Sequence, residues 1–253
     1  TCDFKELHPT EGYKKMAALT LPSYRVEDLD GRPVEAKIED LGANFEYDLP
    51  KDKFRQARIA RQVRVTIPVH LVPLSWTTFQ LLEGAQEHRD GIYQNGVIDT
   101  PFVAVSVDDN ITVYDKTTHE AYEDFIRFED RGDIGNEYIY FQPKGTEPIY
   151  AELKGYEVLE NTARYAKILL KHELTVPISA DKKLEEEQKG IIEFMKREAG
   201  RSEELTSIPL ETEMTVFVDN PQIRCKTRFT NTAKDHRIRL LVKTHNTRPS
   251  NDS

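Results

Sequence analysis

The chain has 253 residues, of which 38% are hydrophobic and 31% are charged, and its formal net charge is −9. This length is sufficient for one large domain or two ordinary domains with a real hydrophobic core. The acidic balance argues against a nucleic-acid partner, because binding to a phosphate backbone needs clustered Lys and Arg. No apolar run approaches the roughly 18 residues that a membrane-spanning helix requires, so we expect no membrane partner either.

The two cysteines, Cys2 and Cys225, lie far apart in the sequence, so they predict neither a disulfide framework nor a thiolate metal site. The seven histidines show no spacing typical of metal ligands. The chain begins with Thr1 rather than Met, so the absence of a signal peptide says little about its compartment. A cytoplasmic location is the default expectation.

Short strand-like runs separated by polar turns dominate the first third of the chain. They cover residues 16–21, 34–41, 63–71 and 77–82. A polar stretch with no strong periodicity follows, over residues 83–95. This pattern predicts a small β-sandwich domain at 1–83 and a linker at 84–99.

The remaining sequence predicts a second β-unit. Residues 102–107 alternate in hydrophobicity, and Asp108, Asp109 and Asn110 then supply a turn before the strand-like residues 111–114, so we expect a hairpin. Further strands are expected at 150–155, 166–176, 211–218, 223–230 and 237–243. One sizeable helix is expected, at about 184–196, because its apolar residues fall near one helical face.

The predicted fold class is therefore mainly β, with a smaller β-sandwich preceding part of a larger one at 100–253. Two sheets of that size would normally need more strands than the sequence supplies after residue 243. We expect the chain to be a piece of a longer polypeptide. Uncovered strand edges recruit partners, so the remainder of that polypeptide or a homo-oligomer is the expected partner.

The densest acidic group surrounds two glycines and has two readings. It is either a solvated loop, with 130–133 as a polar turn, or a site of catalytic carboxylates or of a cation. Its members are Glu123, Asp124, Glu129, Asp130, Asp133 and Glu137.

Three aromatic residues could contact a ligand. Trp76 follows Pro73 at the start of a strand, which favours packing over a ligand platform. Tyr138 and Tyr140 follow the acidic segment, and an exposed tyrosine offers both a ring face and a hydroxyl group. Burial of these tyrosines in the core is equally consistent with the sequence.

Residues 231–241 read as a strand, a tight polar turn and a second strand, which alone would indicate a hairpin. Together with Phe128 to Tyr138, this segment resembles the C-terminal β-region of glycoside hydrolase family 38, the α-mannosidases. Similar tracts occur in the same order over about half of the chain. They are residues 115–122, 128–140, 176–181, 201–205, 209–213 and 231–241.

The resemblance implies a galactose mutarotase-like β-supersandwich for the second unit. It implies that the parent enzyme hydrolyses α-mannosides with retention and that its catalytic domain holds a zinc ion and an aspartate nucleophile. None of the catalytic domain's motifs can be placed on this chain. We therefore expect no catalytic and no metal-binding residue here, zinc only in the catalytic domain, and no activity of the chain alone.

One residue role is carried over from the family. A tyrosine in a Gly-x-x-Tyr loop of this region reaches the sugar pocket in family members, and Gly135-Asn136-Glu137-Tyr138 matches that pattern. Tyr138 is thus the expected substrate-binding residue for a mannoside, with Tyr140 as the alternative. Two other functions remain open: a stand-alone carbohydrate-binding β-sandwich that uses Trp76, Tyr138 and Tyr140, and a purely structural β-domain.

Overall fold

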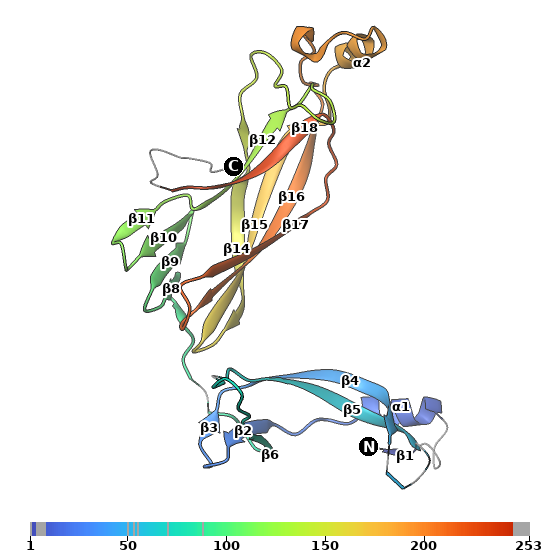
Figure 1. The fold of residues 1–253 in the computed structure, drawn as a ribbon, viewed down its shortest axis with the longest axis vertical. Coiled ribbons are helices and arrows are strands. Elements are labelled where there is room, and N and C mark those ends of the chain that lie inside the picture. Colours follow the sequence, from blue (N-terminus) through green and yellow to red (C-terminus); the bar gives the residue numbers. More distant parts are fainter. Residues whose placement is uncertain are drawn as a thin grey trace. The chain divides into compact units, whose positions relative to one another are not determined.

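The computed structural model describes residues 2–3, 9–49, 51–52, 54, 56–69, 71–87 and 89–244. Strands dominate these residues, which confirms the predicted mainly β class (Figure 1). Their helical segments are α1 (Pro9–Ala17), α2 (Lys182–Lys189) and the 3₁₀ turn η1 (Phe194–Lys196). No helix in the described ranges has the length and apolar character needed to cross a bilayer. The chain divides into two compact units, Thr1–His88 and Arg89–Ser253.

The first unit contains two antiparallel sheets and helix α1. One sheet has the order β1 (Cys2–Asp3), β5 (Gln56–Thr66), β4 (Lys37–Asp48), and the other the order β3 (Pro33–Val34), β2 (Tyr24–Asp28), β6 (Phe79–Glu83). Helix α1 packs on β4 and β5. Its core contact joins Met16 to Ile59, with Ala43 beside them.

The strand predicted at 16–21 is wrong, because Met16 belongs to α1. Gly12 and Met16 lie four residues apart and share one face of the helix. A Cβ atom at Gly12 would lie 2.8 Å from Ile59 Cδ1, so the glycine allows the helix to approach β5 closely. The helical conformation allows Met16 to be buried against Ile59. This tertiary contact is not visible in the short alternating pattern from which the strand is predicted.

The second unit is built from three antiparallel sheets. The five-stranded sheet contains β11 (Glu120–Tyr122), β10 (Ile111–Asp115), β9 (Val103–Val107), β8 (Val97–Asp99) and β7 (Tyr93–Gln94). The four-stranded sheet contains β14 (Glu152–Asn161), β15 (Tyr165–Pro177), β16 (Leu205–Phe217) and β17 (Ile223–Phe229). The three-stranded sheet contains β13 (Ile149–Tyr150), β12 (Ile126–Gly132) and β18 (His236–Val242).

The predicted hairpin is confirmed, because Ile111 of β10 pairs with Val107 of β9. Strands β7 and β8 lie within 84–99, so strands occupy part of the segment that the sequence predicts to be a linker. The domain assignments at 1–83 and 100–253 stay predictions.

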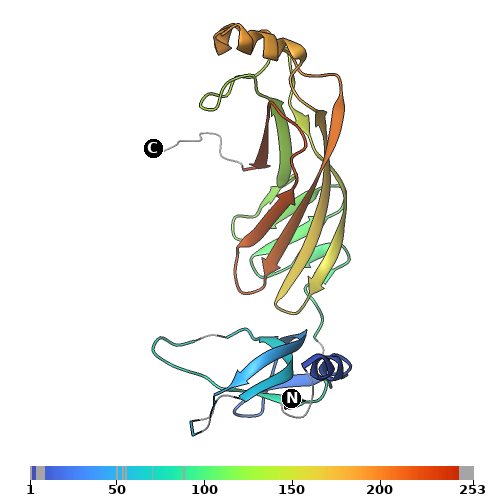
Figure 2. The same cartoon turned by 90° about the vertical axis from the view of Figure 1, so that its right-hand side faces the viewer.

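The core of the second unit lies between its sheets (Figure 2). Burial alternates along β15 and β16, as expected for strands with one face packed on a core. Buried residues of β9, β12, β15 and β16 belong to one apolar cluster; examples are Val105, Phe128, Leu170 and Leu210. This packing fixes the position of β12, and the loop at residues 133–141 follows the end of that strand.

The predicted helix is correct in place but too long. Asp181 caps α2 by accepting a hydrogen bond from the Lys183 backbone N–H at 3.0 Å. The helix ends at Lys189 with Gly190 as its C-cap, and Ile191, which the prediction includes in the helix, is 91% exposed with a φ of 54°. Leu184 is buried as predicted.

The hairpin indicated by residues 231–241 is not formed. The strands on either side belong to different sheets, because β17 pairs with β16 and β18 pairs with β12. Asp235, with a φ of 51°, immediately precedes β18. Residues 230–235 therefore carry the chain from one sheet to another.

Candidate functional site: a tyrosine loop beside a buried ion-pair network

Tyr138 lies on an irregular loop after β12, and its side chain is 87% exposed. Asn136 shapes this loop, because its Oδ1 accepts hydrogen bonds from the backbone N–H groups of Tyr138 (2.9 Å) and Ile139 (2.8 Å). The Asn136 N–H donates to the Ile139 carbonyl at 3.0 Å. An asparagine that bonds its own backbone two residues on is typical of a tight turn. The turn presents the tyrosine ring to solvent.

The base of the loop is held by two side chains. Asp133 Oδ1 accepts hydrogen bonds from the N–H groups of Gly135 (2.9 Å) and Phe141 (3.1 Å). Arg197 Nη1 donates to the carbonyls of Ile134 (2.5 Å) and Gly135 (2.6 Å). Ile134 itself is buried in a small apolar cluster that includes Leu184. The loop is thus fixed to the body of the unit without strand pairing.

Tyr140, the alternative site residue, has a different environment. It is half-buried, its hydroxyl donates to Gln142 Oε1 at 3.2 Å, and the Arg237 guanidinium lies 5.1 Å from its ring centroid. That distance is within cation–π range. The structure therefore leaves the Tyr138 ring exposed and engages the Tyr140 ring.

Asp130 belongs to a buried ion-pair network, which the sequence did not predict. The predicted polar turn at 130–133 is wrong, because β12 extends to Gly132. Asp130 Oδ1 lies 2.5 Å from His236 Nδ1, and its Oδ2 lies 2.5 Å from Arg201 Nη1. His236 Nε2 lies 3.0 Å from Asn231 Oδ1. The side chains of Asp130, His236 and Arg201 are 0%, 2% and 8% exposed.

Glu129, the neighbouring carboxylate, is also buried and paired. It accepts hydrogen bonds from Arg131 Nε (2.9 Å), Arg239 Nε (2.9 Å) and the Tyr150 hydroxyl (3.3 Å). Burial alone would raise the pKa of Glu129, but the hydrogen bonds and charges of Arg131 and Arg239 outweigh it and lower the pKa to about 2. Glu129 and Asp130 are therefore each buried and paired with basic or imidazole side chains, so the solvated-loop reading of the acidic segment is wrong for these two residues.

His172 is a second buried titratable group, on β15. It is 6% exposed, and its ring centroid lies 5.2 Å from that of Phe128 in an edge-to-face arrangement. Burial lowers the pKa of His172 to about 4. The imidazole is consequently neutral at pH 7.

These two groups predict how stability depends on pH. His172 is protonated in the unfolded chain below about pH 6.5 but in the folded chain only below about 4, so stability falls as the pH drops through this window. Glu129 loses its ion pairs as the pH falls from about 4.5 towards 2, which removes further stability. Each shift corresponds to about 3 kcal/mol at most.

Urea unfolding at stepped pH values tests this expectation. His172→Phe should flatten the dependence between pH 6.5 and 4 and leave the lower window in place, because Phe does not titrate. A wild-type free energy of unfolding that is constant from pH 7 to pH 4 would contradict the prediction.

No group of three or more His, Cys, Asp or Glu side chains within the described ranges is arranged to hold a metal ion. The zinc ion that the family resemblance implies is expected in the catalytic domain, and that placement stays a prediction.

Trp76, in the first unit, is 83% exposed, so the prediction that it packs is wrong. Pro73 precedes it by three residues, and residues 73–78 lie in a turn and irregular chain before β6 begins at Phe79. The tryptophan therefore has no sheet face on which to pack.

Comparisons with known proteins give one consistent result. Residues 1–83 match the family model "Glycosyl hydrolases family 38 C-terminal domain 1". A curated protein of Halalkalibacterium halodurans, named "Putative mannosylglycerate hydrolase", is 31% identical over 245 aligned positions, and the match covers 90% of this chain and 27% of that protein.

Two solved structures from Enterococcus faecalis are similar across both units. An α-mannosidase from strain V583 matches with a TM-score of 0.82 and 33% identity, over 94% of this chain and 28% of its own. A family 38 glycosyl hydrolase matches with a TM-score of 0.78 and 29% identity, over 94% of this chain and 29% of its own. The chain thus spans little more than a quarter of the length of these relatives. It belongs to the C-terminal β-region of glycoside hydrolase family 38.

Proposed function

We propose that this chain is the C-terminal β-region of a retaining α-mannosidase, in which it supports the catalytic domain and lends Tyr138 to the substrate site. The observation that carries the proposal is the exposed Tyr138 ring on a loop that Asn136, Asp133 and Arg197 fix by hydrogen bonds. A binding group that is ordered before the substrate arrives avoids the cost of immobilisation on binding.

The chemistry proposed for this chain is limited to substrate positioning. The phenolic hydroxyl of Tyr138 would donate a hydrogen bond to a mannoside oxygen, and its ring face could cover the apolar side of the sugar. The nucleophile and zinc of the retaining mechanism would belong to the catalytic domain, so the isolated chain should not hydrolyse a chromogenic α-mannoside. A reducing cytoplasmic location is part of the same proposal, and the free thiol of Cys225 is compatible with it.

Exposed apolar side chains support the proposed partner, which is the remainder of the polypeptide. Leu240 and Val242 on β18 are each 49% exposed, and Phe229 on β17 is 46% exposed. Apolar side chains on such strands are suited to burial against another domain or a second copy of the chain. A homo-oligomer is the corresponding proposal for the isolated chain.

Tyr138→Phe in the full-length enzyme tests the role of this residue. The change keeps the ring and removes only the hydroxyl, so folding should be unaffected. Loss of one hydrogen bond to the substrate costs about 0.5–1.5 kcal/mol, and we expect kcat/KM for an α-mannoside to fall roughly two- to tenfold.

Tyr140→Phe is the matched control. It removes a hydroxyl that bonds to Gln142 within the protein, so kcat/KM should stay near the wild-type value. Equal and negligible effects of both changes would assign Tyr138 a structural role. A loss confined to Tyr140→Phe would transfer the substrate contact to that residue.

The stand-alone carbohydrate-binding alternative is less well supported. Of the two tyrosines that it needs, only Tyr138 offers a free ring, because Tyr140 is engaged by Gln142 and Arg237. Binding of mannosides by the isolated chain that depended on Trp76 would restore this alternative.

A further inference from the structure

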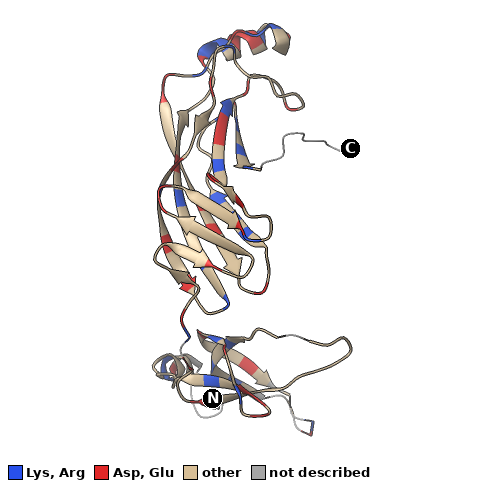
Figure 3. Cartoon of the chain, turned by 90° about the vertical axis from the view of Figure 1, so that its left-hand side faces the viewer, with Lys and Arg blue, Asp and Glu red and all other residues tan. Residues whose placement is uncertain are grey.

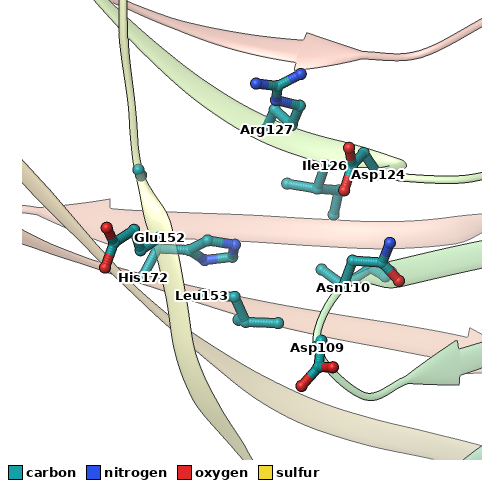
Figure 4. Close-up of a pocket in the computed structure, with 10 residues that line it drawn as sticks. Asp109, Asn110, Asp124, Ile126, Arg127, Glu152, Leu153 and His172 are labelled. Carbon is teal, nitrogen blue, oxygen red and sulfur yellow. The ribbon is translucent and has the colours of Figure 1, made fainter.

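A cavity of about 340 Å³ lies in the second unit, where its three sheets converge. The β9–β10 turn, the start of β12, the start of β14 and the middle of β15 line it (Figure 4). Its volume is within the range of small-molecule sites in proteins. The cavity contains neither Tyr138 nor any residue of the buried ion-pair network.

His172 supplies a polar group inside this cavity. The imidazole extends from β15 into the space between Leu153 and Asn110 (Figure 4). Its Nδ1 is buried and has no hydrogen-bond partner among the described residues. A buried polar atom without a partner costs about 1–3 kcal/mol, so such atoms are normally satisfied. A ligand that bonds to Nδ1 would remove this cost.

The other lining residues define the chemistry of the ligand. Half-buried Leu153 gives the interior an apolar surface, whereas Ile111 and Ile126, which also line it, are core residues with 2% and 5% exposure. Asp109 and Asp124 lie at the rim and make no side-chain hydrogen bond or ion pair with any described residue, so their oxygens are available as acceptors. Figure 3 shows how acidic and basic residues are distributed along the chain. Arg127 also lies at the rim, with its guanidinium 3.9 Å from the Tyr150 ring centroid.

The same residues also indicate which ligand charge the cavity favours. Glu152 at the rim pairs with Lys154, with 2.5 Å between Nζ and Oε2, and Lys154 also lies 3.7 Å from Glu173 Oε2, so carboxylates outnumber cations around the cavity. This excess disfavours an anion. The carboxylates and His172 do not form a group able to hold a metal ion in this described region. A neutral ligand with several hydroxyl donors and an apolar face satisfies all of these groups.

We propose that this cavity is a second carbohydrate site, separate from the Tyr138 loop, which binds a neutral pyranose. The apolar face of the sugar packs on Leu153. One ring hydroxyl bonds to His172 Nδ1, and others donate to Asp109 and Asp124. The site would retain a sugar chain on the β-region and does not depend on the proposed function of Tyr138.

Titration of the 253-residue chain with methyl α-mannoside, followed by two-dimensional NMR of the backbone amides, tests the proposal. We expect saturable shifts confined to residues around 109–111, 124–127, 151–153 and 172. His172→Phe, Asp109→Asn and Asp124→Asn should each weaken the affinity about two- to tenfold, the effect of one hydrogen bond. Asn tolerates the positive φ of 51° at Asp124, so that change preserves the turn.

Asp219→Asn is the matched control, because Asp219 is an exposed carboxylate that does not line the cavity. It should leave the affinity unchanged. Absence of shifts at millimolar sugar, or shifts that survive all three cavity substitutions, would overturn the proposal. Binding of mannosamine but not of methyl α-mannoside would overturn the assignment of a neutral ligand. A loss of affinity confined to Tyr138→Phe would place sugar binding at the loop and would also refute the cavity site.

Discussion

Asp130→Asn is expected to lower the free energy of unfolding of the second unit by about 3–5 kcal/mol. The substitution preserves shape and removes the negative charge that faces Arg201 and His236. Arg201 is 8% exposed, so its guanidinium would remain buried without a counter-charge, and an uncompensated buried charge is strongly destabilising. Hydrogen exchange of the β12 amides, read together with urea unfolding, measures the effect.

The matched control is Glu157→Gln, which breaks a surface ion pair. Glu157 and Lys171 lie 3.0 Å apart but are 57% and 48% exposed, so the loss should stay below about 1 kcal/mol. Similar costs for the two substitutions would show that the Asp130 network contributes no more than a solvated pair.

Gly135→Ala is expected to disrupt the tyrosine loop without unfolding the unit. A Cβ atom at this position would lie 1.8 Å from the Ile139 carbonyl oxygen and 2.9 Å from the Phe141 nitrogen, both of which are backbone atoms. The loop can accept the methyl group only if the Asn136–Ile139 turn opens. If Tyr138 contacts the substrate as proposed, its displacement removes the same hydrogen bond as Tyr138→Phe and should lower kcat/KM of the full-length enzyme at least roughly two- to tenfold.

Gly145→Ala provides the comparison on a neighbouring turn. Gly145 has a φ of 71°, and a Cβ atom there would meet nothing within 4 Å, so the change costs only the backbone strain of about 1–2 kcal/mol. Activity should be retained. Faster amide exchange at 133–141 in Gly135→Ala but not in Gly145→Ala would support the model, and normal activity of Gly135→Ala would refute a positioned loop.

Strand positions could be predicted from the sequence wherever burial is one-sided. Val103 to Val107 alternate between buried and half-buried, and the alternation of their side chains identifies both the strand and its turn. Helix α1 gives no clear helical pattern in the sequence, because burial within residues 10–17 is confined to Gly12 and Met16. The segment 231–241 was misjudged because strand pairing is a long-range property, and a polar turn does not specify which sheet the next strand joins.

The buried network could not be predicted from local patterns. Glu129 and Asp130 are consecutive, and in a regular strand consecutive side chains face opposite sides, so joint burial requires cover on both faces. One signal was available, because the strand that pairs with them carries His236, Arg237 and Arg239. Opposite charges on two strand-like segments indicate cross-strand pairs. The exposure of Tyr138, by contrast, depends on the turn made by Asn136. Alternation of side chains between two faces applies to strands, so it cannot predict where a turn directs its side chains.

Strands β12 and β18 pair with each other but lie far apart in the sequence, so the ribosome completes β12 long before β18. Asp130 and His236 are 106 residues apart, and Glu129 and Arg239 are 110 residues apart. Because the ribosome releases the chain from its N-terminus, Asp130 emerges long before His236. Glu129 likewise emerges long before Arg239, although Arg131 follows it closely. During that interval β12 lacks β18, so one of its edges is unpaired and both acidic side chains lack their partners on β18. The nascent chain therefore passes through a stage in which this strand is open to incorrect pairing, and completion of β18 ends that stage.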